Sequence, residues 1–186
     1  MSKLLAFGAS SSKNSKNKKL ASYVAKRMAP KEVNLVDLNE FEMPIYSEDR
    51  EEELGIPDKA YEFKKLVNES IGIIISLAEH NGSYTSAFKN IYDWISVIEK
   101  TVWSNKPLIL LSTSDGQNAG NTVLQTALSR FSRQSTLEIP HFALPKFNEN
   151  FSDTDGITDK KLSEDLDKQI SIFSRQVENL LNSSNN

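Results

Sequence analysis

Cysteine is absent from the 186 residues of this sequence, and histidine occurs only twice, as His80 and His141. The absence of cysteine excludes disulfides, thiolate catalysis and zinc–cysteine sites, and it gives no sign of secretion. The two histidines lie far apart, and the acidic residues show no paired spacing typical of acid–base hydrolysis. The sequence therefore predicts no metal site and no hydrolytic centre built from side chains.

Long apolar runs and an excess of positive charge are also missing. Only four apolar residues follow Lys3, fewer than the core of a signal peptide requires, and no stretch approaches a membrane span. The formal net charge is −3, so there is no electrostatic reason to expect nucleic acid or an anionic membrane surface as a partner. We expect a cytoplasmic protein with one domain over residues 1–186 and a frayed polar tail at 182–186.

Predicted strands and helices alternate five times along the chain. The apolar runs at 4–7, 33–38, 71–77 and 107–112 predict strands, and the weaker run at 136–139 predicts an edge strand. Helical patterns follow at 15–29 and 123–131, and others begin near residues 57, 83–86 and 158. Segments 39–55 and 147–155 are expected to be exposed loops. Such alternation predicts an α/β fold, a three-layer sandwich around a five-stranded parallel sheet.

The polar loop at residues 8–17 follows the first predicted strand and precedes a helix. The amino end of a helix offers free N–H groups that suit a phosphate, and four serines add hydroxyl donors. The loop matches neither G-x-x-x-x-G-K-[ST] nor G-x-G-x-x-G, so it favours a single phosphate, as in a mononucleotide. Its composition is equally typical of a turn that only caps a helix. A phosphate loop after the first strand favours the flavodoxin-like strand order 2-1-3-4-5.

Two further polar loops, at residues 78–84 and 112–120, follow the third and fourth predicted strands. In a sheet of that order, the strands before the three loops are neighbours, so the loops share one edge. Small and hydrogen-bonding residues allow backbone amides to approach a flat polar ring closely. The sequence therefore predicts a mononucleotide with its phosphate on the first loop and its heteroaromatic ring on the other two.

The second loop reads Ala-Glu-His-Asn-Gly-Ser-Tyr at 78–84 and is followed by Phe88-Lys89-Asn90 and Asp93-Trp94. It resembles the NADPH-dependent FMN reductase family, whose loop reads Pro-Glu-Tyr-Asn-Gly-Ser-Tyr-Pro. The first loop is similar to the family's Gly-Ser-x-Arg-x-x-Ser-x-Asn, and residues 112–120 are similar to its Ser-Ala-Ser-Pro-Gly-x-x-Gly-Gly. Departures are Ser12 in place of Arg, Ala78 and Asp115 in place of Pro, His80 in place of Tyr, and Ala119 in place of Gly.

The resemblance implies an FMN-dependent oxidoreductase. NADPH or NADH would reduce bound FMN, which would pass the electrons to a flavin, a quinone, an azo compound or a metal oxyanion. No catalytic side chain is implied, because the cofactor carries the chemistry. The implied FMN contacts are Ser10, Ser12, Ser15, Lys16, Asn17, Ala78, Glu79, His80, Asn81, Gly82, Ser83, Ser112, Thr113, Ser114 and Gly116. The family also implies a homodimer or homotetramer. Alternatives are a flavodoxin-type electron carrier and a sheet that has lost its flavin.

Overall fold

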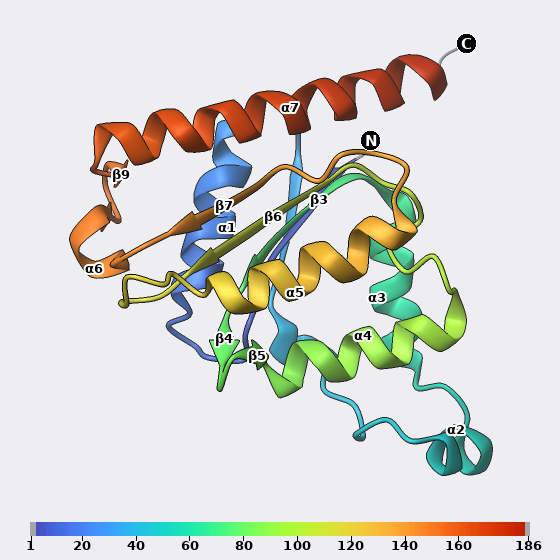
Figure 1. Cartoon of the computed structure of the whole chain (residues 1–186). Helices are drawn as coiled ribbons and strands as arrows, with labels where there is room; N and C mark the ends of the chain where they lie inside the picture. Colours follow the sequence, from blue (N-terminus) through green and yellow to red (C-terminus); the bar gives the residue numbers. More distant parts are fainter. Residues whose placement is uncertain (1–2, 185–186) are drawn as a thin grey trace.

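The computed structural model describes residues 3–184, and a five-stranded, all-parallel sheet lies at its centre (Figure 1). The spatial order of the strands is β2-β1-β3-β6-β7, which confirms the predicted 2-1-3-4-5 order. The strands are β1 (Lys3–Ala9), β2 (Val33–Val36), β3 (Ser70–Leu77), β6 (Leu108–Thr113) and β7 (His141–Leu144). Every residue of β3 and β6 is buried, as expected for central parallel strands covered on both faces.

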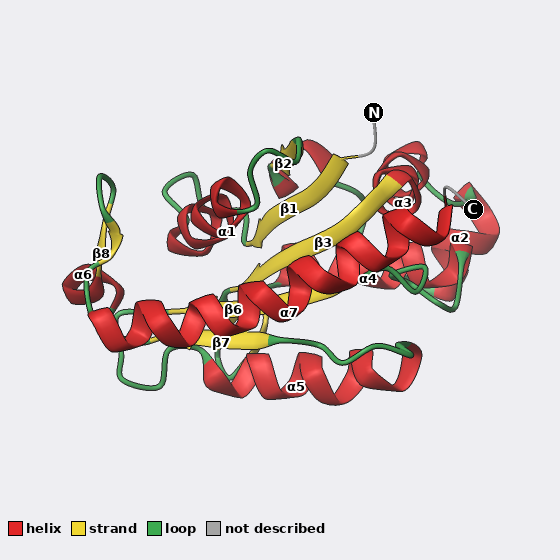
Figure 2. Ribbon diagram, turned by 90° about the horizontal axis from the view of Figure 1, so that it is seen from above, coloured by secondary structure: helices red, strands yellow, loops and turns green. Residues whose placement is uncertain are grey.

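Helices cover both faces of the sheet, so the flavodoxin-like three-layer sandwich is confirmed (Figures 1 and 2). On one face lie α1 (Lys16–Arg27) and α7 (Lys160–Ser184). On the other lie α3 (Asp58–Glu69), α4 (Ser86–Ile98) and α5 (Asn121–Phe131). Alternate residues of β3 serve the two cores: Ile73 and Ile75 face α3, α4 and α5, and Ile74 faces α1 and α7.

Three stretches differ from the sequence predictions. The last strand begins at His141, whereas the run at 136–139 was predicted, because β7 pairs with β6 only after Pro140. The segment at 147–155 is not an exposed loop. It contains the short helix α6 (Phe147–Asn150), with Phe147 buried, and the strand β8 (Phe151–Ser152), which pairs with β9 (Gly156–Ile157). Residues 182–184 continue α7 where a frayed tail was predicted, and residues 185–186 lie outside the described part.

The predicted acidic loop at 39–55 is partly helical. It contains the 3-10 helix η1 (Leu38–Phe41) and α2 (Glu48–Leu54). α2 has no buried residue and stands away from the sheet, which explains why no apolar periodicity marked it (Figure 1). Within residues 3–184, no helix is long and apolar enough to cross a membrane.

Candidate functional site

The three predicted loops meet at the carboxyl edge of the sheet, because β1, β3 and β6 are neighbours. Register pairs Ala9 at the end of β1 with Leu77 of β3, and Leu77 in turn with Ser112 of β6. The β1–α1 turn, the short hairpin after β3 and the loop before α5 therefore leave the sheet side by side. This edge is where doubly wound sheets bind ligands.

The β1–α1 turn brings the first turn of α1 against the end of β1. A Cβ atom at Gly8 would lie 2.3 Å from the backbone nitrogen of Lys18, so only glycine permits this approach. Ser15 caps the helix, and its Oγ accepts the N–H of Lys18 at 3.1 Å. The N–H groups of Lys16 and Asn17 have no acceptor within a helix that begins there, so they are free to bind an anion.

The hydroxyls of this turn differ in exposure. Ser10 is buried, and its Oγ accepts the N–H of Ser12 at 3.1 Å, which folds the turn back on itself. Ser12 is exposed, and Ser15 is buried at the cap. Each bonded serine oxygen still has its own O–H to donate. The turn thus presents hydroxyl donors and helix N–H groups at one place.

The side chain of Asn17 forms hydrogen bonds with two strands of the sheet, β3 and β6. Its Nδ2 donates to the carbonyl of Thr113 at 3.2 Å, while its Oδ1 accepts from Ser76 Oγ at 2.8 Å and from the N–H of Thr113 at 3.1 Å. Asn17 is 5% exposed. We expected this side chain to hold a phosphate, but it ties α1 to β3 and β6.

Lys16 bridges the first and third loops. Its ammonium forms an ion pair with the carboxylate of Asp115, and both side chains are partly exposed. The pair neutralises a carboxylate that would otherwise face an incoming anion. Lys18, one turn of helix away from Ser15, instead pairs with Asp37 at 2.5 Å, and this contact lowers the pKa of the Asp37 carboxyl.

The loop after β3 is a hairpin made of β4 (Glu79–His80) and β5 (Ser83–Tyr84). Asn81 and Gly82 at its tip have φ angles of +52° and +75°, the left-handed pair that a two-residue hairpin needs. The side chains of His80, Asn81 and Ser83 are exposed, whereas Ala78 is buried at the end of β3. The Asn-Gly pair was a signal for this hairpin in the sequence.

The carboxylate of Glu79 points into the fold. Its Oε2 accepts the N–H of Val123 at 3.0 Å, within the first turn of α5. The residue that caps α5 is Gly120, which has no side chain to serve this purpose. Glu79 therefore fixes the hairpin to α5, and its carboxylate is directed away from the loop surface.

The loop after β6 begins with two buried side chains. Thr113 donates its hydroxyl to the carbonyl of Leu144 at 2.7 Å, and Ser112 is fully buried. Ser114 and Gly116 follow at the surface, with their carbonyls accepting from Phe147 and Lys146. The exposed residues of this loop are Asp115, Gly116, Gln117 and Asn118, rather than the hydroxyl-bearing residues that we expected from the sequence.

Thr85 was not predicted as a site residue. Its hydroxyl donates to the carbonyl of Ala9 at 2.9 Å and accepts the N–H of Phe88 at 3.2 Å. It therefore joins the end of β1 to the start of α4 and holds the hairpin between them. A threonine just before an apolar helical pattern was the available signal.

Tyr84, at the end of the hairpin, packs on Phe88 with ring centroids 5.4 Å apart. Its hydroxyl is buried without a hydrogen-bond partner among residues 3–184, and burial raises the pKa of Tyr84 to about 12. The neutral phenol is therefore held in place as an apolar wedge under the hairpin. Within the same residues, no group of three His, Asp or Glu side chains could hold a metal.

The edge suits FMN in two respects. The close approach at Gly8 and the open first turn of α1 leave backbone N–H groups and hydroxyls for a phosphate. Exposed glycines at the hairpin tip, Gly82, and in the loop after β6, Gly116, allow the backbone to approach a flat ring closely. A groove of about 470 Å³ opens beside Ser11, between the chain after β2 and the start of α4, and much of its lining is apolar.

Comparison with known proteins agrees with this geometry. The family model described as NADPH-dependent FMN reductase matches residues 2–149. A 2-hydroxy-1,4-benzoquinone reductase from Burkholderia sp is 31% identical over 117 residues, which span 62% of each protein. A quinone reductase from Escherichia coli (strain K12) is 27% identical over 79 residues, or 42% of each. The chain thus matches less than two thirds of the length of either relative.

Two solved structures share the fold. The flavoenzyme NAD(P)H:(acceptor) oxidoreductase FerB from Paracoccus denitrificans superposes with a TM-score of 0.73 at 20% identity, covering 96% of this chain and 98% of the other. An azoreductase from Bacillus anthracis str. Sterne gives 0.61 at 14% identity, covering 94% and 100%. The family match covers most of the chain and all three loops, and the fold agrees with it. This chain belongs to the NADPH-dependent FMN reductase family.

Proposed function

We propose that the whole chain is one FMN-binding domain that oxidises NADPH or NADH and reduces a small acceptor. The observation that carries this proposal is the meeting of the open first turn of α1 with the hairpin after β3 and the loop after β6 at one sheet edge. The family match supports it. Bound FMN supplies the hydride and electron transfer. The names of the relatives favour a quinone or an azo compound among the candidate acceptors.

The phosphate of FMN would lie on the β1–α1 turn. The N–H groups of Lys16 and Asn17 and the hydroxyls of Ser10, Ser12 and Ser15 would donate to it, in keeping with the free donors of a helix start. No arginine is present in this turn, so backbone and hydroxyl donors carry most of the recognition.

The ring of FMN would lie between the hairpin and the loop after β6. Backbone groups of Asn81, Gly82 and Ser83 would border one side, and those of Ser114 and Gly116 the other. The exposed side chain of His80 would shape the face that reductant and acceptor approach. The loops would be held in position from beneath by residues that do not face the ring: Ala78, Glu79, Ser112, Thr113 and the side chain of Asn17.

The exposed segment around α2 bears on the oligomeric state of the protein. We propose a homodimer or homotetramer in the cytoplasm, with a small-molecule acceptor as the other partner. α2 stands away from the sheet with Leu54 72% exposed, and Ile45 just before it is 74% exposed, which supports burial of this segment against a second copy.

The test is a flavin titration followed by turnover. Purified protein is expected to bind FMN more tightly than riboflavin, because only FMN carries the phosphate, and to oxidise NADPH or NADH in the presence of a quinone. Equal affinity for the two flavins would contradict the phosphate assignment. Tight FMN binding without any oxidation of NADPH or NADH would identify an electron carrier instead.

A further inference from the structure

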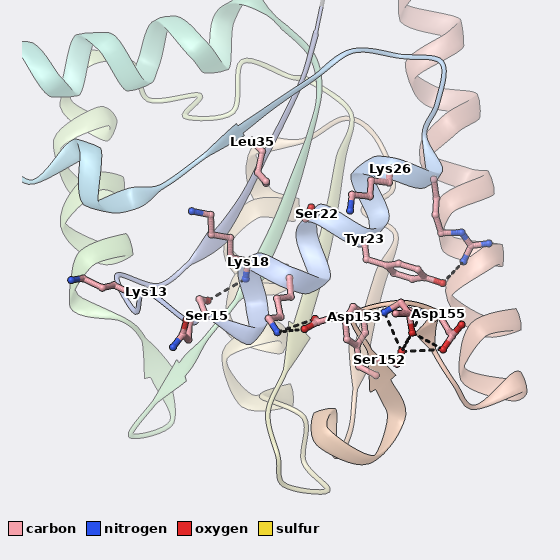
Figure 3. Close-up of a pocket in the computed structure, with 16 residues that line it drawn as sticks. Lys13, Ser15, Lys18, Ser22, Tyr23, Lys26, Leu35, Ser152, Asp153 and Asp155 are labelled. Atoms are coloured by element: carbon pink, nitrogen blue, oxygen red, sulfur yellow. Dashed lines mark hydrogen bonds and ion pairs between the residues drawn. The ribbon is translucent and has the colours of Figure 1, made fainter.

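A second concave surface lies over the outward face of α1 (Figure 3). This α1 groove has a volume of about 550 Å³ and runs between Leu35 of β2 and the β8–β9 hairpin. It begins at residues 13–15 of the β1–α1 turn and continues to Arg27. Since a helix rises about 1.5 Å per residue, Lys26 lies roughly 16 Å along the axis from Ser15. The far part of the α1 groove is therefore separate from the turn proposed for FMN.

Cationic side chains dominate the α1 groove. Five line it, and only two acidic side chains do, although the whole chain has a net charge of −3: the cations are Lys13, Lys18, Lys19, Lys26 and Arg27, and the acids are Asp153 and Asp155. Concentration of one charge in a concave surface attracts ligands of the opposite sign. The α1 groove is therefore complementary to an anion.

Two of these cationic side chains, Lys13 and Lys26, have no carboxylate partner in the described part of the chain and are therefore free to bind an anion. Lys18 pairs with Asp37, Lys19 with Asp153, and Arg27 with Asp167. Within residues 3–184, the ammonium groups of Lys13 and Lys26 form no ion pair or hydrogen bond. Both side chains are exposed; in Figure 3 Lys13 lies on the β1–α1 turn, and Lys26 lies further along α1.

The α1 groove also has an aromatic wall. The ring of Tyr23 meets that of Phe151 edge-on at 5.6 Å, and the guanidinium of Arg27 lies 5.5 Å from the Tyr23 ring centroid. A Cβ atom at Gly156 would lie 2.1 Å from a Tyr23 ring carbon, so the hairpin fits closely around the tyrosine. Residues far apart in the sequence thus build a surface that is cationic and aromatic at once.

We propose that the α1 groove binds a phosphate monoester of an aromatic nucleoside. The phosphate would pair with Lys26, whose ammonium group has no carboxylate partner among the described residues, and the base would pack against Tyr23. An uncharged ligand would leave the ammonium group of Lys26 unpaired. A long polyanion would meet Asp153 and Asp155 and the negative charge of the rest of the chain. Two sources offer this chemistry: a free nucleotide, or the 2′-phosphoadenosine end of NADPH, the latter resting on the function proposed above.

The binding test uses 2′-AMP and adenosine as probes, titrated into the full chain by calorimetry. We expect 2′-AMP to bind at least tenfold more tightly than adenosine. Lys26→Gln is expected to weaken 2′-AMP binding at least fivefold and to leave the affinities for adenosine and FMN unchanged. Lys65→Gln is the matched control, because Lys65 is an exposed lysine of α3, on the other face of the sheet. Equal affinity for the two probes, or equal effects of the two substitutions, would overturn the proposal.

Turnover distinguishes the two sources. If the site receives NADPH, Lys26→Gln raises KM for NADPH and leaves KM for NADH unchanged. If neither KM changes while 2′-AMP binding is weakened, the proposal holds and the ligand is a free nucleotide. Absence of NADPH and NADH oxidation by the unmodified protein would refute the proposed function but would not alter the result with 2′-AMP.

Discussion

The β1–α1 turn and the loop between β6 and α5 have similar compositions but use their side chains in different ways. In the turn, Ser11 and Ser12 are exposed and the first N–H groups of α1 are open. In the loop, Ser112 and Thr113 are buried beneath the edge, and the exposed residues are Asp115, Gly116, Gln117 and Asn118. Similar hydroxyl-rich sequences therefore leave some hydroxyls exposed in the turn, whereas those of Ser112 and Thr113 in the loop are buried.

Asn17 connects these two regions, so its substitution should have the largest effect. Asn17→Ala would deprive Ser76 Oγ and the N–H of Thr113 of their shared acceptor in a buried place. We expect the free energy of unfolding to fall by about 2–4 kcal/mol, measured by urea denaturation. Asn14→Ala is the control, because Asn14 is exposed in the same turn, and it should change stability by less than about 0.5 kcal/mol. Similar losses for the two variants would show that Asn17 does not connect the regions.

Ser12→Arg adds a charged donor to the exposed β1–α1 turn. FMN binding should tighten by at most about 1.5–3 kcal/mol, because a guanidinium forms strong charge-assisted bonds with phosphate. The dissociation constant for FMN is measured in the same buffer for each protein. Ser11→Arg carries the same charge on the neighbouring exposed residue and should have a smaller effect. Unchanged or weaker binding by Ser12→Arg would place residue 12 away from the phosphate.

Glu79→Ala tests the internal support on the other side of the site. Loss of the bond to the Val123 N–H removes the side-chain cap of α5, which should cost about 1 kcal/mol in the free energy of unfolding. Glu79→Gln retains a hydrogen-bond acceptor at the same position, so its free energy of unfolding should fall by less than that of Glu79→Ala. If the two variants unfold at the same urea concentration, the contact is not the source of the stability.

Tyr84→Phe should have the smallest effect near neutral pH and a larger one at high pH. The unfolded phenol ionises near pH 10, whereas burial raises the folded pKa to about 12. The unfolded state therefore loses its proton first, and stability falls as pH rises from 10 towards 12. The Tyr84→Phe variant has no phenol to ionise, so its stability does not fall in this way. At pH 11 its free energy of unfolding should exceed that of the unmodified protein by up to about 1 kcal/mol, after allowance for partial burial. A stability difference that stays constant between pH 8 and pH 11 would contradict the buried phenol.

The central fold could be predicted because its signals are local. The unbroken apolar run of β3 and the polar loops after successive strands are readable from neighbouring residues. The last strand was misplaced because its position depends on pairing with β6, and α2 was missed because it buries no side chain. Apolar periodicity reveals neither the partner and register of a strand nor a helix that has no buried face.

The loops of the site could be located from the sequence, but the direction of their side chains could not. Asn17 bonds to residues 59 and 96 positions away, and Glu79 bonds to a residue 44 positions away. Such distant partners leave no trace in the local pattern. The side chain of Asn17 was therefore assigned to the phosphate, whereas it bonds to β3 and β6 and only its N–H remains assigned to the ligand.

The ion pair between Lys16 and Asp115 places two opposite charges beside the first turn of α1. A bare carboxylate at position 115 would repel an approaching phosphate, and the lysine cancels most of that repulsion. Both side chains are partly exposed, whereas the hydrogen bonds of Asn17 beneath them are buried. Charges at the rim of a site change the association rate more than the lifetime of the complex. We therefore expect substitutions of Lys16 or Asp115 to change the rate at which FMN associates more than the rate at which it dissociates.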